Sequence, residues 1–205
     1  MMEVPTEVIK VLGDQYEKIV EIGEKYEWGR GKGHAFKVAQ LTSDLWTSAE
    51  KEGLVRDDVN LRKALYTAAL LHDIGIKRGG EHHEVSAEII KKEVGNIEPN
   101  LADRSSVIAY HHRSKTNPME DIRVNRDRDM LLAIALLRIA DALDYQLDQR
   151  VRHAAITVRE DKVVIEVHCG LNDYISFDIE RVRKKKSLLE QLIGRGIEIE
   201  ERRQS

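Results

Sequence analysis

Histidine and aspartate residues lie at the ends of apolar segments in this sequence, where they could bind a metal ion together. His72 and Asp73 are adjacent in LLHDIG (70–75), near the end of a segment with helical periodicity. A neutral imidazole beside a carboxylate suits a borderline divalent metal. A lone His-Asp pair is also typical of a helix C-terminus, where the histidine interacts with the helix dipole. Taken alone, the pair favours this second interpretation.

Asp141 changes that balance because it lies in the apolar segment LLRIADALD (136–144). A buried carboxylate without a partner costs several kcal/mol, so Asp141 must have a cation. The cation is either a metal ion or Arg138, which precedes it by three residues on the same helical face. The residues by themselves leave both alternatives open.

The remaining histidines of the helical region make the metal site the better hypothesis. His34 follows a glycine-rich turn, and two adjacent histidine pairs stand at 82–83 and 111–112. The interval from His82 to His111 equals that from His112 to Asp141, and each fits one helix and a return to the same end of a bundle. We therefore predict a metal site whose ligands are His34, His72, Asp73, His82, His111, His112 and Asp141. The sequence leaves open whether His82 or His83 is the ligand.

The elements that position these residues are mostly helical. Periodicity predicts helices over 5–27, 34–52, 57–76, 82–94, 101–113 and 129–147, with a polar loop at 114–128. After residue 150 the pattern changes to strands at 154–160, 161–167, 173–177 and 196–201, with a helix over 178–193. We predict a mainly α fold: a helical bundle over 1–150 and a small ββ(β)αβ C-terminal subdomain over 151–205.

Composition excludes several classes of protein. The chain has 205 residues, a formal charge of −3 and one cysteine, so neither a disulfide framework nor a thiolate zinc cluster fits. It contains no secretory signal and no apolar run of the roughly 18 residues that span a membrane. We expect a cytoplasmic protein that binds neither membranes nor nucleic acid.

The order of these motifs resembles the HD-domain metal-dependent phosphohydrolase superfamily. The matching elements are HAFKVAQLTSDLW from His34, LLHDIG, HHEVSAEII from His82, AYHHR with His111 and His112, and RIADALD with Asp141. This resemblance implies that His34, His72, Asp73 and Asp141 bind one divalent metal. Members with the additional histidines bind a second, and alignment of HHEVSAEII favours His82 over His83.

A narrower resemblance is to the C-terminal HD region of the exopolyphosphatase/guanosine pentaphosphate phosphohydrolase family. It rests on the same motifs and on the less specific C-terminal pattern ending in ERVRKKKSLLEQLIGRGIEIE. That family cleaves polyphosphate in an actin-like region, which these residues do not contain, so we do not expect exopolyphosphatase activity. The lysine that often follows HDIG is Ile76 here, with Lys77 and Arg78 next.

The resemblance implies hydrolysis of a phosphomonoester or phosphodiester, most plausibly in a nucleotide, by a metal-activated water. Asp73 is expected to bridge two metals, while Lys77, Arg78 and Arg113 would meet negative charge on the phosphoryl oxygens. Each of these bases, taken singly, is more typical of an ordinary surface than of a catalytic site. The histidine ligands suit Mn, Fe, Zn, Ni or Co better than Mg, and protonation predicts metal loss below about pH 6.

The alternative is a non-catalytic regulatory or polyanion-binding module with the same fold. A basic stretch over 181–186 motivates it, although such a stretch is more often a solvated helix face. Exposed strand edges in the C-terminal region leave a homodimer open.

Overall fold

The computed structural model describes residues 4–204 and confirms a mainly α fold with a small sheet. The helices of the N-terminal part are α1 (Thr6–Leu12), α2 (Tyr16–Lys25), α3 (Lys32–Lys51), α4 (Val59–Leu71), α5 (His82–Glu93), α6 (Pro99–Tyr110) and α7 (Arg128–Ala142). They are followed by β1 (His153–Val158), β2 (Val163–Gly170), α8 (Ser176–Lys185), α9 (Ser187–Ile193) and β3 (Ile197–Gln204).

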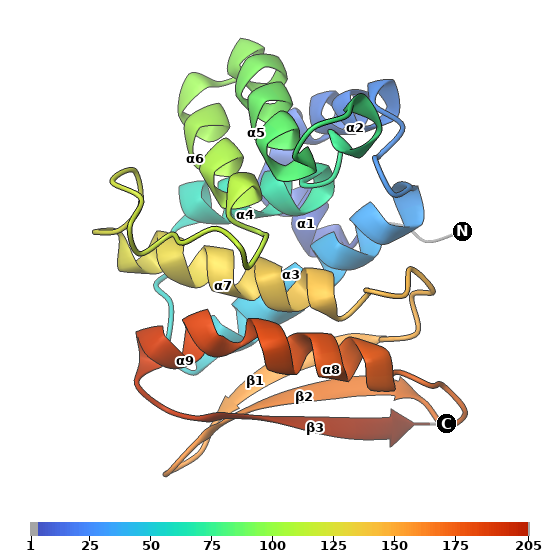
Figure 1. The fold of residues 1–205 in the computed structure, drawn as a ribbon, viewed down its shortest axis with the longest axis vertical. Helices are drawn as coiled ribbons and strands as arrows, with labels where there is room; N and C mark the ends of the chain where they lie inside the picture. The colour runs from blue at the N-terminus through green and yellow to red at the C-terminus, as the bar shows by residue number, and fades with distance from the viewer. Residues whose placement is uncertain (1–3, 205) are drawn as a thin grey trace.

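Helix α7 lies at the centre of the molecule because its sequence is apolar on nearly all sides. Every residue from Met130 to Ala142 is buried. The helix packs against α3, α4 and α6 on one side and against α8 and α9 on the other. In Figure 1 it therefore lies between the upper helices and the C-terminal layer of helices and strands.

Two long helices of the sequence prediction are each divided in the structure. The segment predicted as one helix over 5–27 breaks at Gly13, whose φ of 55° is left-handed, and α2 then begins at Tyr16. The segment predicted over 178–193 is divided into α8 and α9 at Lys186.

The sheet has the strand order β1-β2-β3. Strands β1 and β2 are antiparallel with Ile156 opposite Ile165, while β2 and β3 are parallel with Ile165 opposite Ile199. The strand predicted over 173–177 is wrong, because α8 already begins at Ser176. Asp173 instead accepts a hydrogen bond from the Gly170 amide, which closes a turn at the end of β2.

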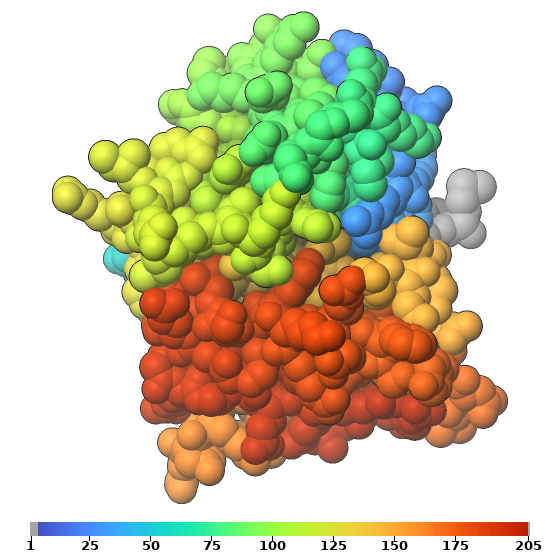
Figure 2. Space-filling model, viewed as in Figure 1, coloured from blue at the N-terminus to red at the C-terminus, as the bar shows by residue number. Residues whose placement is uncertain are grey.

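The C-terminal part is joined to the helical part by hydrogen bonds along β1. Ser48 Oγ accepts from the Ile156 amide, and Glu52 accepts from the Val158 amide, so α3 covers the free edge of β1. In Figure 2 the orange-to-red surface of the C-terminal part lies directly against the green and yellow helical part. The edge of β3 carries several charged side chains, and a homodimer through it stays a prediction.

Among the residues described, no helix combines the length and the apolar character that crossing a membrane requires.

Candidate metal centre

The structure brings six of the predicted ligands together from five separate segments. His34 lies in the first turn of α3, His72 and Asp73 follow α4, and His82 begins α5. His112 follows α6, and Asp141 lies in the last turn of α7. All are buried except His82, whose side chain is 17% exposed. We call these six residues the His–Asp cluster.

The first half of the cluster surrounds one oxygen of each carboxylate. His34 Nε2 lies 3.6 Å from both Asp73 Oδ2 and Asp141 Oδ1. His72 Nε2 lies 3.4 Å from Asp73 Oδ2 and 3.6 Å from Asp141 Oδ1. These four side chains thus point their ligand atoms at one point.

The second half uses the other oxygen of Asp73. Its Oδ1 lies 3.5 Å from His82 Nε2 and 3.7 Å from His112 Nε2. Asp73 therefore faces both groups of imidazoles, one with each oxygen.

Hydrogen bonds on the far side of three imidazoles fix the direction of their Nε2 atoms. His34 Nδ1 lies 2.8 Å from Asp144 Oδ2, while the Nδ1 atoms of His72 and His112 lie 2.9 and 2.6 Å from the carbonyl oxygens of Ala69 and Ala109. A proton held on Nδ1 leaves the lone pair of Nε2 free, which is the usual arrangement of a histidine that binds a metal.

The residues present fit a divalent metal ion. His34 Nε2, His72 Nε2, His82 Nε2 and Asp73 Oδ1 are buried without a hydrogen-bond partner, an unfavourable state unless a cation is bound. Two ligands about 2.1 Å from a tetrahedral metal are separated by about 3.4 Å, close to the separations observed here. The mixed imidazole and carboxylate donors suit a borderline metal.

Cations of the chain also contact the carboxylates of the cluster. Arg30 Nε forms an ion pair with Asp73 Oδ2 at 3.0 Å, and Lys185 of α8 forms one with Asp141 Oδ2. Neither residue is among the ligands and bases predicted from the sequence. Arg30 could have been noticed in GRGKG beside His34, whereas Lys185 is one of several bases in its helix and carries no distinguishing signal.

The predicted catalytic bases occupy different places. Lys77 pairs with Glu27 at 2.5 Å, and the Arg78 guanidinium lies over the ring of Tyr26, so neither contacts the cluster. Arg113 directly follows the cluster residue His112; burial lowers the pKa of His82, and the positive charges of Arg113 and Arg30 lower it further.

His111 and Arg138 are placed apart from the cluster. The ring nitrogens of His111 lie 3.0 Å from Thr116 Oγ1 and 2.8 Å from Asp121 Oδ2, so neither is free to bind a metal. Arg138 donates to the carbonyl oxygens of His111, Arg113 and Thr116 and therefore holds the loop after α6 rather than Asp141.

His83, the other candidate ligand of its pair, lies beside Tyr110 rather than within the cluster. Its ring centroid is 5.1 Å from that of Tyr110, and its Nδ1 lies 3.6 Å from Glu81.

Gly75 permits the close approach of α4 and α5. A Cβ at this position would lie 2.5 Å from the Ser86 nitrogen and 2.9 Å from the His82 carbonyl oxygen, both backbone atoms. The Gly75 amide also donates to Ser86 Oγ at 2.9 Å. The glycine thus sets the position of His82 relative to Asp73.

Replacing Gly75 with alanine should destabilise the fold by about 1–3 kcal/mol, because backbone must move to admit the methyl group. Urea unfolding checks the stability, and elemental analysis checks whether less metal is retained. Gly196→Ala is the matched control, since its Cβ would meet no atom within 4 Å. Equal stability of the two variants would show that the close approach has no energetic role.

Ionisation within the cluster is coupled to its burial. Burial alone would lower the pKa of His72, but the carboxylates of Asp73 and Asp141 outweigh it and raise the pKa to about 10. For Asp141, Lys185, His34 and His72 overcome the effect of burial and hold the carboxyl pKa well below its ordinary range. Burial lowers the pKa of His112 to about 3.

These shifts predict that the metal-free protein is most stable near pH 6.5, the ordinary pKa of histidine. The raised pKa of His72 gives stability that is full below pH 6.5 and is lost as the pH rises toward 10. Below pH 6.5 the unfolded chain gains a proton at His112 that the folded chain does not bind, so stability falls there too. Calorimetry in a chelator from pH 5 to 10 tests this, and a melting temperature that rises steadily to pH 9 would contradict it.

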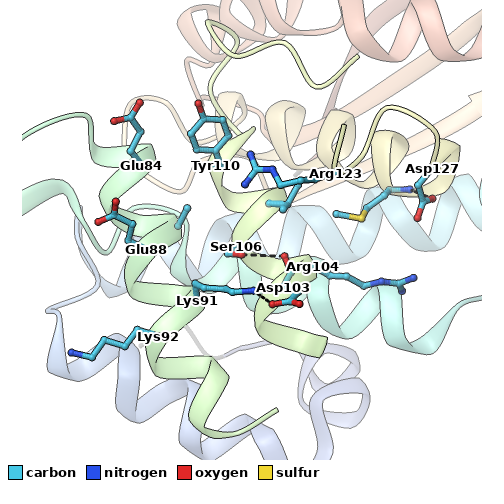
Figure 3. A pocket seen from close by; sticks show the side chains of 13 residues that line it. Glu84, Glu88, Lys91, Lys92, Asp103, Arg104, Ser106, Tyr110, Arg123 and Asp127 are labelled. Atoms are coloured by element: carbon cyan, nitrogen blue, oxygen red, sulfur yellow. Dashed lines mark hydrogen bonds and ion pairs between the residues drawn. The ribbon is translucent and has the colours of Figure 1, made fainter. Parts of the chain in front are cut away.

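One pocket of the described residues lies away from the His–Asp cluster. It lies between α5 and α6 and is lined by Glu84, Glu88, Lys91, Asp103, Tyr110 and Arg123 among others. Figure 3 shows Lys91 paired with Asp103 across it. None of the six cluster residues lines this pocket, so it is not the metal site predicted from the sequence.

Fold and site together define a helical domain with a buried histidine–aspartate cluster able to hold a metal ion. The HD domain family model matches residues 31–146, which include all six cluster residues. The chain belongs to the HD domain family. HD domains bind divalent metals, and most of them are metal-dependent hydrolases.

One curated relative matches part of the chain. It is a bifunctional uridylyltransferase/uridylyl-removing enzyme from Gluconobacter oxydans (strain 621H), 35% identical over 99 residues. The match covers 41% of this chain and 10% of that enzyme. This relative is not a member of the exopolyphosphatase/guanosine pentaphosphate phosphohydrolase family, so the narrower resemblance stays a prediction from sequence.

Proposed function

We propose that this protein hydrolyses a phosphoester bond of a nucleotide with two divalent metal ions in the His–Asp cluster. The observation that carries the proposal is that the two carboxylate oxygens of Asp73 face different histidines. Oδ2 faces His34 and His72, while Oδ1 faces His82 and His112. A carboxylate between two sets of unpaired imidazole nitrogens is the arrangement that bridges two metals.

The proposed ligands of the first ion are His34, His72, Asp73 and Asp141, and those of the second are Asp73, His82 and His112. Mn, Fe, Zn, Ni and Co suit these donors better than Mg. When bound, such ions activate water for attack on phosphorus and stabilise charge on the phosphoryl oxygens. His111 is left out because both its ring nitrogens already have partners.

Other side chains of this chain would stabilise charge on the substrate and orient the ligands. His82 is the most exposed of the six, so the second group of ligands faces the substrate. Arg30, paired with Asp73, and Arg113, which directly follows the ligand His112, would meet the negative charge that develops on the phosphoryl group. Asp144 holds the ring of His34 in the orientation that metal binding requires.

A nucleotide is proposed as the substrate partly because the curated relative is named for removing a uridylyl group. The sequence resemblance to phosphohydrolases acting on phosphorylated small molecules supports the same class. We also propose a cytoplasmic location, which is consistent with such a substrate.

The experiment is a screen of nucleotides and model phosphoesters with Mn-loaded protein, preceded by elemental analysis. We expect hydrolysis of at least one substrate class, abolished by a chelator and restored by Mn. His72→Ala combined with Asp73→Ala should bind no metal and show no activity. His153→Ala is the control, since that histidine pairs with Asp44 outside the cluster.

The outcomes separate the two functions considered from the sequence. Metal-loaded protein that hydrolyses nothing across the screen would favour the non-catalytic module. Unchanged metal content in the double variant would refute the proposed site itself.

A further inference from the structure

The basic residues of α8 are divided into two groups by the fold. Arg183 and Lys184 are exposed and pair with Glu180 on their own helix, at 4.0 and 3.2 Å. Lys185 instead reaches Asp141 in the His–Asp cluster, and its side chain is only 14% exposed. The expectation of a solvated helix face therefore holds for the first pair of bases and fails for Lys185.

Arg181 lies on the same face of α8 as Lys185, one helical turn earlier. Its guanidinium lies 3.9 Å from the ring centroid of Tyr145. Tyr145 follows Asp141 by four residues and is 42% exposed, so this pair lies at the surface beside the buried cluster.

Arg30 contacts the His–Asp cluster from the helical part, where its Nε lies 3.0 Å from Asp73 Oδ2. Arg30 and Arg113, which directly follows the ligand His112, are the cations already assigned to the phosphoryl group that reacts. Arg181 is the cation next to Tyr145, and its guanidinium lowers the pKa of the Tyr145 hydroxyl.

The two oxygens of Asp141 contact different groups, so that Lys185 can keep its ion pair when a metal is bound. Oδ1 faces His34 and His72, whereas Oδ2 accepts the ion pair from Lys185. Lys185 can therefore remain in place when Oδ1 binds a metal, and its ammonium group then borders the site as a fixed positive charge.

We propose that Arg181 and Lys185 bind phosphate groups of the substrate beyond the one that is hydrolysed. The inference rests on the proposed function and deepens it, since it names the substrate class as compounds with two or more linked phosphates. An isolated phosphomonoester carries at most two negative charges, which two divalent metals already balance. Two additional cations beside the cluster, Arg181 and Lys185, are complementary to a longer phosphate chain.

The test measures anion binding to the whole 205-residue chain, loaded with Mn, by calorimetry. The probes are orthophosphate and imidodiphosphate, whose P–N–P linkage resists hydrolysis. We expect imidodiphosphate to bind at least about tenfold more tightly than orthophosphate. Lys185→Gln and Arg181→Gln should each lose about tenfold in imidodiphosphate affinity, whereas Lys184→Gln and Arg183→Gln should stay within about twofold of the unmodified protein.

Metal content is measured before and after each titration, so that the two proposals can fail separately. Absence of bound metal in the unmodified protein would overturn the proposed function. Normal metal content with unchanged imidodiphosphate affinity in Lys185→Gln and Arg181→Gln would overturn only this inference. Equal losses in Lys184→Gln and Lys185→Gln, or equal affinity for both probes, would overturn it as well. Arg181 is a surface residue, so its variant tests the inference even if Lys185→Gln folds poorly.

Discussion

Replacing Asp73 with asparagine is expected to release both metal ions and to lower phosphoesterase activity by at least about 10³-fold. Both oxygens of Asp73 face imidazole nitrogens, and an amide supplies only one, uncharged oxygen to the two groups. The variant should still fold, because asparagine has nearly the same shape and removes the repulsion between Asp73 and Asp141. Elemental analysis and circular dichroism measure these two results.

Asp141→Asn makes the expectation sharper because Asp141 belongs only to the first group of ligands. Its metal content should fall by about one ion, whereas Asp73→Asn should lose about two. Asp148→Asn, which alters a carboxylate paired with Arg150 outside the cluster, should retain both. Equal metal losses in the Asp73 and Asp141 variants would contradict a shared role for Asp73.

Addition of Mn to metal-free protein is expected to raise the melting temperature by about 5–10 °C at a hundredfold excess over the dissociation constant. A ligand at that concentration stabilises the folded state by about 2.7 kcal/mol if it does not bind the unfolded chain. The site offers a structural reason, since both carboxylates are buried and Asp73 Oδ1 has no hydrogen-bond donor.

Differential scanning fluorimetry with Mn, Mg and a chelator tests this effect. Mn should exceed Mg, because imidazole nitrogen is a poor ligand for Mg. The Asp73→Asn variant is the control and should show little change with either ion. A shift of the same size in that variant would mean that the ions bind elsewhere.

Much of the cluster could be predicted because each ligand stands at the end of an apolar helical segment. His72, Asp73 and Asp141 were visible in this way, since a charged group in an apolar segment requires a partner. The fold class followed from the same periodicity. Which of two adjacent histidines is the ligand was harder to predict. Helix α6 ends at Tyr110, so His111 and His112 point in different directions, and only His112 faces Asp73.

The place of Lys185 at the site could not be predicted because it depends on how distant segments meet. Lys185 and Lys184 are adjacent and chemically identical, and only the rotation of α8 against α7 brings Lys185 to Asp141. Lys77 and Arg78 are close to Asp73 in sequence, yet their side chains contact Glu27 and Tyr26. Proximity in sequence was therefore a poor guide to proximity at the site.

The burial of α7 on all sides has a consequence for how the chain can be shortened or fused. Helices α8 and α9 cover one of its faces, and the β1 amides are bound by Ser48 and Glu52 of the helical part. A fragment ending near residue 150 would leave an apolar face of the central helix in water and Asp141 without Lys185. The boundary between helices and strands is thus an unsuitable place to cut the chain.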